Sequence, residues 1–169
     1  MERTVLLLGD PRLYEASVPV RREELPDIES VLADLHDTLM AYRKKYGAGR
    51  AIAAPQIGAM KRLIYMHIDR PVAMVNPVLE FSGPGSDEMM EVLDDCMSFP
   101  GLYVRVLRHR RCRIRFLDTT WTEQSMDLEG DLSELIQHEY DHLDGILATM
   151  RAVDSRSLVM KFPPAPQAG

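Results

Sequence analysis

Residues 137–142 read Gln137-His138-Glu139-Tyr140-Asp141-His142 and carry the pattern H-E-x-x-H. On an α-helix the two histidines lie on one face, one turn apart, and their ring nitrogens can converge on one metal ion. The carboxylate of Glu139 can then reach a water bound to that metal. Helical histidine pairs also occur on ordinary surfaces, but these two lie beside an apolar stripe. The stretch therefore predicts a metal-binding helix.

The residues around this stretch predict where the helix begins and ends. Asp131 is a suitable N-cap, and Glu134 three residues later completes a capping-box pattern. Gly145 is suited to end the helix. A second helix is predicted upstream, beginning near Pro26 and ending near Gly47. Its apolar residues follow helical spacing: Ile28, Val31, Leu32, Leu35, Leu39 and Tyr42.

The middle of the chain predicts strands. Apolar runs cover residues 63–68 and 72–75, and Pro77 marks a turn after them. Residues 102–107 and 111–116 alternate between apolar and polar side chains, which predicts two strands joined by a basic turn. The alternation places Cys112 on the apolar face, as a core thiol. Strands in the middle with flanking helices, and no βαβ alternation, predict an α+β fold.

Composition predicts one soluble domain. The chain has 169 residues, of which 46% are hydrophobic and 27% charged. We expect a single catalytic domain over residues 1–160 and a disordered, proline-rich tail over 161–169. No apolar run reaches 18 residues, and the run at residues 5–8 is too short for a signal peptide, so the expected location is the cytoplasm, with no membrane contact. In that reducing compartment Cys96 and Cys112 are not expected to pair.

The charge of the chain indicates which binding partners to expect. The net charge of −6 argues against a broad nucleic-acid-binding surface, and none is expected. One basic cluster has two interpretations, the solvated face of a β-hairpin or a local docking patch. It consists of Arg105, Arg108, His109, Arg110, Arg111, Arg113 and Arg115.

A catalytic metal site needs a third protein ligand and one open position. Downstream of His142 the nearby acidic residues are Asp144 and Asp154, and a third histidine is absent. Cys96 is the best candidate, because it stands in the turn-rich segment Asp94-Asp95-Cys96-Met97-Ser98-Phe99-Pro100-Gly101. A thiolate ligand suits Fe²⁺ or Zn²⁺. The alternative is that Cys96 is a buried free cysteine.

Three separated segments resemble the signature motifs of the peptide deformylase family. Gly49-Arg50-Ala51-Ile52-Ala53-Ala54-Pro55-Gln56 resembles G-x-G-x-A-A-P-Q, Asp94-Asp95-Cys96-Met97-Ser98 resembles E-G-C-L-S, and residues 137–145 resemble Q-H-E-x-D-H-L-x-G. Their order and spacing also match. The resemblance implies antiparallel sheets packed around the C-terminal metal-binding helix, with the amphipathic helix near the N-terminus.

The resemblance also implies a reaction. Cys96, His138 and His142 would hold one divalent ion, Fe²⁺ first and Zn²⁺, Ni²⁺ or Co²⁺ as alternatives. Metal-bound water would attack the formyl carbon of an N-formylmethionyl nascent chain, with Glu139 as general base, and formate would leave. Two donors would stabilise the oxyanion, the side-chain amide of Gln56 and the backbone N–H of Met97. Gly49, Ala51, Asp95 and Met97 would contact the substrate, and Asp94 paired with Arg108 would support the site.

The chain departs from the family pattern at four positions. Ala51 replaces a glycine, which is a mild change if the backbone is extended and a costly one if φ is positive. Asp94 replaces a glutamate, and Glu134 stands where an arginine is frequent, which the capping box explains. Asp95 replaces the glycine before Cys96. Its side chain either points into solvent or adds negative charge to the substrate entrance.

Four hypotheses follow. The chain is a peptide deformylase, or it applies the same chemistry to another N-formyl compound, such as a small metabolite with a positive group. Alternatively, it is a metal-binding module without catalysis, which the presence of Glu139 and Gln56 disfavours. A zinc endopeptidase is disfavoured because its usual third ligand is missing. The sequence leaves the native metal, the oligomeric state and any contact with the ribosome open.

Overall fold

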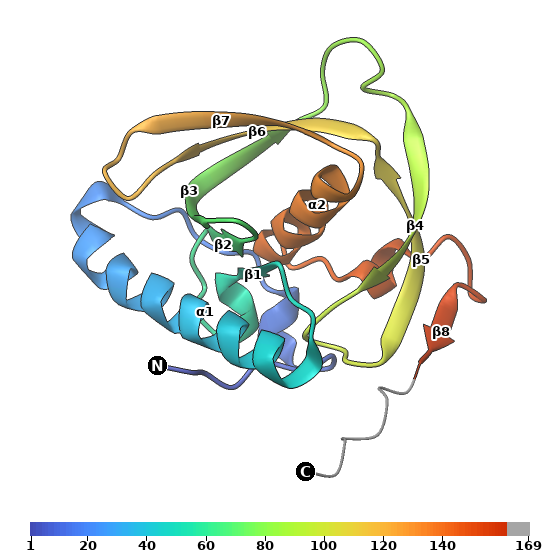
Figure 1. The fold of residues 1–169 in the computed structure, drawn as a ribbon, viewed down its shortest axis with the longest axis horizontal. Helices are drawn as coiled ribbons and strands as arrows, with labels where there is room; N and C mark the ends of the chain where they lie inside the picture. The colour runs from blue at the N-terminus through green and yellow to red at the C-terminus, as the bar shows by residue number, and fades with distance from the viewer. Residues whose placement is uncertain (162–169) are drawn as a thin grey trace.

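The computed structural model describes residues 1–161, which fold into helices and two antiparallel sheets (Figure 1). The helices are η1 (Pro11–Tyr14), η2 (Arg22–Glu24), α1 (Leu25–Tyr46), η3 (Ala54–Ile57), α2 (Asp131–Leu143) and η4 (Ala148–Arg151), where η denotes a 3-10 helix. The strands are β1 (Ala51–Ala53), β2 (Leu63–His67), β3 (Pro71–Glu80), β4 (Met89–Asp95), β5 (Leu102–His109), β6 (Arg111–Leu117), β7 (Glu123–Glu129) and β8 (Leu158–Met160). Residues 162–169, most of the predicted tail, lie outside the described part of the chain. The extent of the catalytic domain, residues 1–160, stays a prediction.

The α2 helix lies in the interior between the two sheets (Figure 1). One sheet has the strand order β1-β2-β3-β6-β7, and the other has the order β4-β5-β8. Nine of the thirteen α2 residues are buried, so the helix has almost no solvated face. Its apolar residues Leu135, Ile136 and Leu143 pack in one core cluster with the five-stranded sheet. The predicted α+β fold with a central metal-binding helix is confirmed.

The α1 helix covers the edge of the larger sheet and was predicted from its spacing. Ile28, Leu32, Leu35 and Leu39 are buried and pack on residues of β1 and β2. Gly47 ends the helix with φ 68°, a left-handed conformation that glycine adopts at little cost. Within residues 1–161, no helix is long and apolar enough to span a membrane.

The predicted hairpin of residues 102–107 and 111–116 is wrong, although both strands exist. β5 pairs with β4 and β8, while β6 pairs with β3 and β7, so the two strands lie in different sheets. Alternation shows which residues share a face, but it does not name the partner strand. The basic stripe on β6 is solvated as predicted, and its arginines pair with acids of neighbouring strands. These pairs are Arg111–Glu129, Arg113–Asp127 and Arg115–Glu80. Cys112 is buried, as predicted.

Two further predictions are corrected. Pro77 does not end a strand, because β3 continues to Glu80 through a bulge between Val75 and Val78. A proline is tolerated at such a bulge since its missing N–H leaves no ladder bond unmade. Asp131 does not cap α2 either. Gly130 is the N-cap, with φ 62°, and no side chain forms a cap hydrogen bond there, so the capping box with Glu134 is absent.

Candidate metal centre

The structure brings Cys96, His138 and His142 together. The two histidines project from α2, and Cys96 follows directly on the last residue of β4. Their ligand atoms all lie within 4.8 Å of one another, and all three residues are buried. Nε2 of His142 is 3.3 Å from Sγ of Cys96 and 3.2 Å from Nε2 of His138. The predicted third ligand is therefore in place, on a segment remote in sequence from the histidines.

These spacings fit one divalent metal ion. Tetrahedral ligands at zinc's usual bond lengths of about 2.0–2.3 Å stand roughly 3.3–3.6 Å apart. The separations of 3.3 Å and 3.2 Å fall at or just below that range. One thiolate and two imidazoles leave a fourth position open, which is the arrangement of a catalytic rather than a structural site. The donor set suits a borderline ion such as Fe²⁺ or Zn²⁺.

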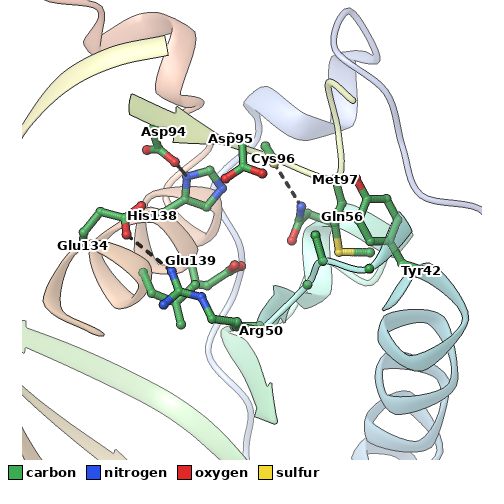
Figure 2. Close-up of a pocket in the computed structure, with 15 residues that line it drawn as sticks. Tyr42, Arg50, Gln56, Asp94, Asp95, Cys96, Met97, Glu134, His138 and Glu139 are labelled. Carbon is green, nitrogen blue, oxygen red and sulfur yellow. Dashed lines mark hydrogen bonds and ion pairs between the residues drawn. The ribbon is translucent and has the colours of Figure 1, made fainter. Parts of the chain in front are cut away.

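A buried ion-pair network supports the first histidine. Oδ1 of Asp94 lies 2.8 Å from Nδ1 of His138 (Figure 2), and Oδ2 accepts a hydrogen bond from Arg108 at 2.8 Å. Arg108 also donates to Asp141 at 2.5 Å, and Arg151 donates to the same carboxylate. Burial alone would raise the pKa of Asp94, but the positive charges of His138 and Arg108 lower it to about 2. The predicted support by Asp94 and Arg108 thus matches the geometry.

Glu139 is buried beside the cluster, with one carboxyl oxygen unsatisfied. Oε2 has no hydrogen-bond partner among the described residues. Burial raises the pKa of Glu139 to about 7, because desolvation disfavours the charged form. A carboxyl group with that pKa exchanges protons readily near neutral pH.

Gln56 faces the cluster from η3, where residues 54–57 turn back after β1. Its Oε1 accepts from the N–H of Ala53 at 2.9 Å, which fixes the amide plane. Its Nε2 then points to Sγ of Cys96 at 3.4 Å (Figure 2) and to Oγ of Ser98 at 3.3 Å. The backbone N–H of Met97 donates no hydrogen bond within residues 1–161. Both donors predicted for an oxyanion therefore stand near the ligand cluster.

A cavity of about 300 Å³ opens onto this cluster (Figure 2). It is lined by the segments 47–51 and 94–97, by Gln56 and Tyr42, and by the α2 residues Glu134, Leu135, His138 and Glu139. The predicted substrate-contacting residues Gly49, Ala51, Asp95 and Met97 all line it. The carbonyl of Gly49 is held by the guanidinium of Arg43, and the N–H groups of Leu6 and Leu8 donate to the carbonyls of Gln56 and Ser98.

The comparisons with known proteins agree with this geometry. The family model described as polypeptide deformylase matches residues 2–157. The chain belongs to the polypeptide deformylase family. Peptide deformylase 2 of Ralstonia nicotianae is 35% identical over 165 residues, covering 91% of this chain and 89% of the relative. The peptide deformylase of Carboxydothermus hydrogenoformans is also 35% identical, covering 88% and 91%.

Solved deformylases share the fold. The Thermotoga maritima enzyme superposes with a TM-score of 0.80 at 28% identity, covering 91% of this chain and 99% of that one. The Acinetobacter baumannii enzyme solved with Met-Ala-Ser bound gives 0.79 at 27% identity, covering 89% and 98%. The fold and the metallohydrolase class predicted for this deformylase are therefore confirmed.

The four departures from the family pattern now have structural explanations. Ala51 lies in β1, where the backbone is extended, so the loss of glycine is mild. Asp94 reaches both His138 and Arg108 despite its shorter arm. Asp95 lines the cavity, so its side chain bears on the substrate entrance. Glu134 also lines the cavity and pairs with Arg50 at 3.6 Å, which replaces the capping explanation.

Several residues of this deformylase's site were missed in the sequence. Ser98 and Asp141 stand inside the second and third motifs, so their positions were a usable signal. Glu134 precedes His138 by four residues and shares its helix face, which was also visible. Arg50 could not be assigned, because its partners Asp131 and Glu134 lie more than 80 residues away in the sequence.

Proposed function

We propose that this deformylase-family chain hydrolyses the formamide C–N bond of N-formylated polypeptides, releasing formate and a free amino terminus. The observation that carries the proposal is the convergence of Cys96, His138 and His142 beside a buried Glu139 with an unsatisfied oxygen. A cavity of about 300 Å³ lies beside them. The crystal structure of the Acinetobacter baumannii relative with Met-Ala-Ser bound supports a peptide ligand. Nascent chains are made in the cytoplasm, where we expect the protein to act.

Cys96, His138 and His142 would hold one divalent metal ion, with Fe²⁺ as our first choice and Zn²⁺, Ni²⁺ or Co²⁺ as alternatives. When bound, such an ion polarises a carbonyl group and lowers the pKa of water. Asp94 positions the His138 ring through Nδ1, so that Nε2 faces the other two ligands. The chain thus presents its donors in a fixed arrangement.

Glu139 moves the proton. Its carboxylate accepts a proton from the attacking water as the water oxygen bonds to the formyl carbon. It then delivers that proton to the amine nitrogen as the C–N bond breaks.

Gln56 and Met97 stabilise the negative charge that develops on the formyl oxygen. The Gln56 amide is preorientated by the N–H of Ala53, so its NH₂ group need not reorganise during the reaction. The N–H of Met97 is the second donor. Removing one such donor from an oxyanion hole typically slows turnover by about 10²–10³-fold.

The test is formate release from N-formyl tripeptides by anaerobically purified, iron-loaded protein. The panel is formyl-X-Ala-Ser with X as Met or Lys, and the unformylated peptides serve as controls. We expect formate from at least one formyl peptide and no cleavage of unformylated ones. No formate from any member, by protein with one metal per chain, contradicts the proposal. Cleavage of an unformylated peptide would favour the endopeptidase alternative.

A further inference from the structure

Besides Asp94 and Glu139, three charged residues line the cavity that contains the reacting groups: Arg50, Asp95 and Glu134 (Figure 2). We propose that Glu134 and Asp95 select substrates with a cationic group, such as an N-formyl peptide whose first residue is lysine or arginine. This inference rests on the proposed function and names the substrate class of the same site. It makes Glu134 and Asp95 specificity-determining residues of the reaction.

Glu134 is the more deeply placed carboxylate. It precedes His138 by one helical turn, so both side chains lie on the face of α2 that lines the cavity. The side chain is 16% exposed, whereas that of Arg50 is 40% exposed. Within residues 1–161 its carboxylate accepts no hydrogen bond, and its ion pair with Arg50 is long, at 3.6 Å.

Arg50 cannot fully compensate Glu134, because its charge is shared. Its Nη1 donates to Asp131 at 2.8 Å, a much closer contact. Asp131 is largely exposed and does not line the cavity, so it draws the guanidinium toward the rim. Glu134 therefore keeps most of its capacity to accept hydrogen bonds from a ligand.

Asp95 adds a second carboxylate without a protein partner, and because the residue is exposed it is solvated when no substrate is bound. In the described part of the chain its side chain forms no ion pair and accepts no hydrogen bond from another residue. Its neighbour Asp94 differs, because Arg108 and His138 already neutralise it. The lining thus holds one shared arginine against two carboxylates that have no close partner. Burial raises the pKa of Glu134 and of Asp95, which agrees with incomplete compensation.

A cationic group on the substrate would neutralise the excess negative charge of the cavity lining, whereas an apolar side chain would displace water from the carboxylates without replacing it. Carboxylates that lose water without gaining a partner carry a large desolvation penalty. An ammonium or guanidinium group supplies the missing donors. An unbranched apolar side chain supplies none, and a carboxylate side chain adds repulsion. The two carboxylates therefore favour a cationic substrate side chain by attraction, and they disfavour apolar and acidic side chains by desolvation and repulsion.

The experiment compares kcat/KM for formyl-X-Ala-Ser with X as Lys, norleucine or Glu, measured as formate release by the iron-loaded protein. We expect Lys to exceed norleucine by at least about tenfold and Glu to be the slowest. Glu134→Gln and Asp95→Asn should each lower the Lys-to-norleucine ratio several-fold. Arg50→Gln should raise it, since the carboxylates then lack their one counter-charge. Glu123→Gln, which removes an exposed carboxylate from β7, is the matched control and should leave the ratio unchanged.

The outcomes separate this inference from the proposed function. If norleucine is preferred and the three cavity variants do not move the ratio, the inference is overturned while formyl hydrolysis stands. If the metal-loaded protein releases formate from no member of the panel, the proposed function fails and the inference fails with it. Because Arg50→Gln shifts the ratio opposite to Glu134→Gln, general damage to the fold cannot imitate the expected pattern.

Discussion

The Nδ1 atom of His138 lies 2.8 Å from Oδ1 of Asp94, so a carboxylate holds the ring of the first predicted metal ligand. Its Nε2 thereby faces the Nε2 of His142 at 3.2 Å. Asp94 is in turn fixed by Arg108, which Asp141 of α2 also binds. The end of β4 and the middle of α2 are therefore connected by these ion pairs as well as by the cluster of predicted metal ligands.

Asp94→Asn should weaken metal binding without abolishing it. The amide keeps the shape but loses the charge that orients His138, and the loss of such a partner typically costs about 10–100-fold in metal affinity. The measurement is competition for Zn²⁺ with a chromophoric chelator. A metal affinity equal to that of the wild type would show that the Asp94–His138 contact does not support the site.

Cys96→Ser should remove stoichiometric metal, while Cys112→Ser should retain it. Both cysteines are buried, but only Cys96 lies with the two histidines. Cys112 instead packs in the core and accepts a hydrogen bond from Ser133. Metal content per chain after gel filtration distinguishes the two. The assignment of Cys96 as a ligand would be wrong if its variant kept one metal per chain.

Glu139→Gln should keep its metal and lose most of its turnover. The amide preserves the size of the side chain but cannot accept the proton, and general-base catalysis typically contributes about 10²–10⁴-fold. Formate release and metal content are measured on the same preparation. Turnover near the wild-type rate would contradict the role of Glu139 as base.

Local patterns in the sequence predicted the parts of this site that are local in the fold. The H-E-x-x-H spacing on α2 fixes the relative positions of two ligands and the base within one and a half turns. The stripe of α1 likewise follows from helical periodicity alone. Cys96 was the best candidate for the third ligand from its turn-rich segment, but only the family resemblance favoured it over a buried free cysteine, because nothing in residues 94–101 identifies which helix they pack against.

Tertiary partners explain the features that local sequence patterns could not predict; the pairing of Asp94 with Arg108 came from the family resemblance alone. Arg108 stood within a basic cluster, yet it is buried on β5 while its neighbour Leu107 is exposed, because Asp94 and Asp141 neutralise it. The pattern of β5 and β6 showed their faces but not that they belong to different sheets. In the sequence, Glu134 matched only a local capping-box pattern. The cavity that it lines is built from three segments that are far apart in the sequence, so its position there could not be predicted.

The turn between β6 and β7 should contribute stability that depends on pH. Asp118 accepts hydrogen bonds from the N–H groups of Thr120 and Thr122 and from the amide of Gln124. The hydrogen bonds from Thr120 and Thr122 contribute most to lowering its pKa from 3.8 to about 2. A depressed carboxyl pKa stabilises the fold above pH 3.8, and this contribution is lost as the pH falls toward 2.

Asp118→Asn should accordingly lower the Tm by a few degrees at pH 7, and the difference from the wild type should shrink below pH 4. Thermal unfolding followed by circular dichroism across this range is the measurement. A Tm difference that stays constant between pH 7 and pH 2 would show that the charge of Asp118 is not involved.

Gly145→Ala should be more destabilising than Gly130→Ala, although both glycines have positive φ, 71° and 62°. A Cβ at Gly145 would lie 2.6 Å from the backbone carbon and oxygen of Tyr14, whereas a Cβ at Gly130 meets no atom within 4 Å. Each variant places an alanine at positive φ, which costs about 1–3 kcal/mol; at Gly130, where ψ is −128°, the backbone lies outside the left-handed helical region. The overpacking at Gly145 adds about 1–3 kcal/mol more, because backbone atoms cannot move aside as a flexible side chain would. Urea unfolding of the two variants under identical metal loading measures the difference, and equal free energies of unfolding would mean that residues 14–15 do not pack against the end of α2.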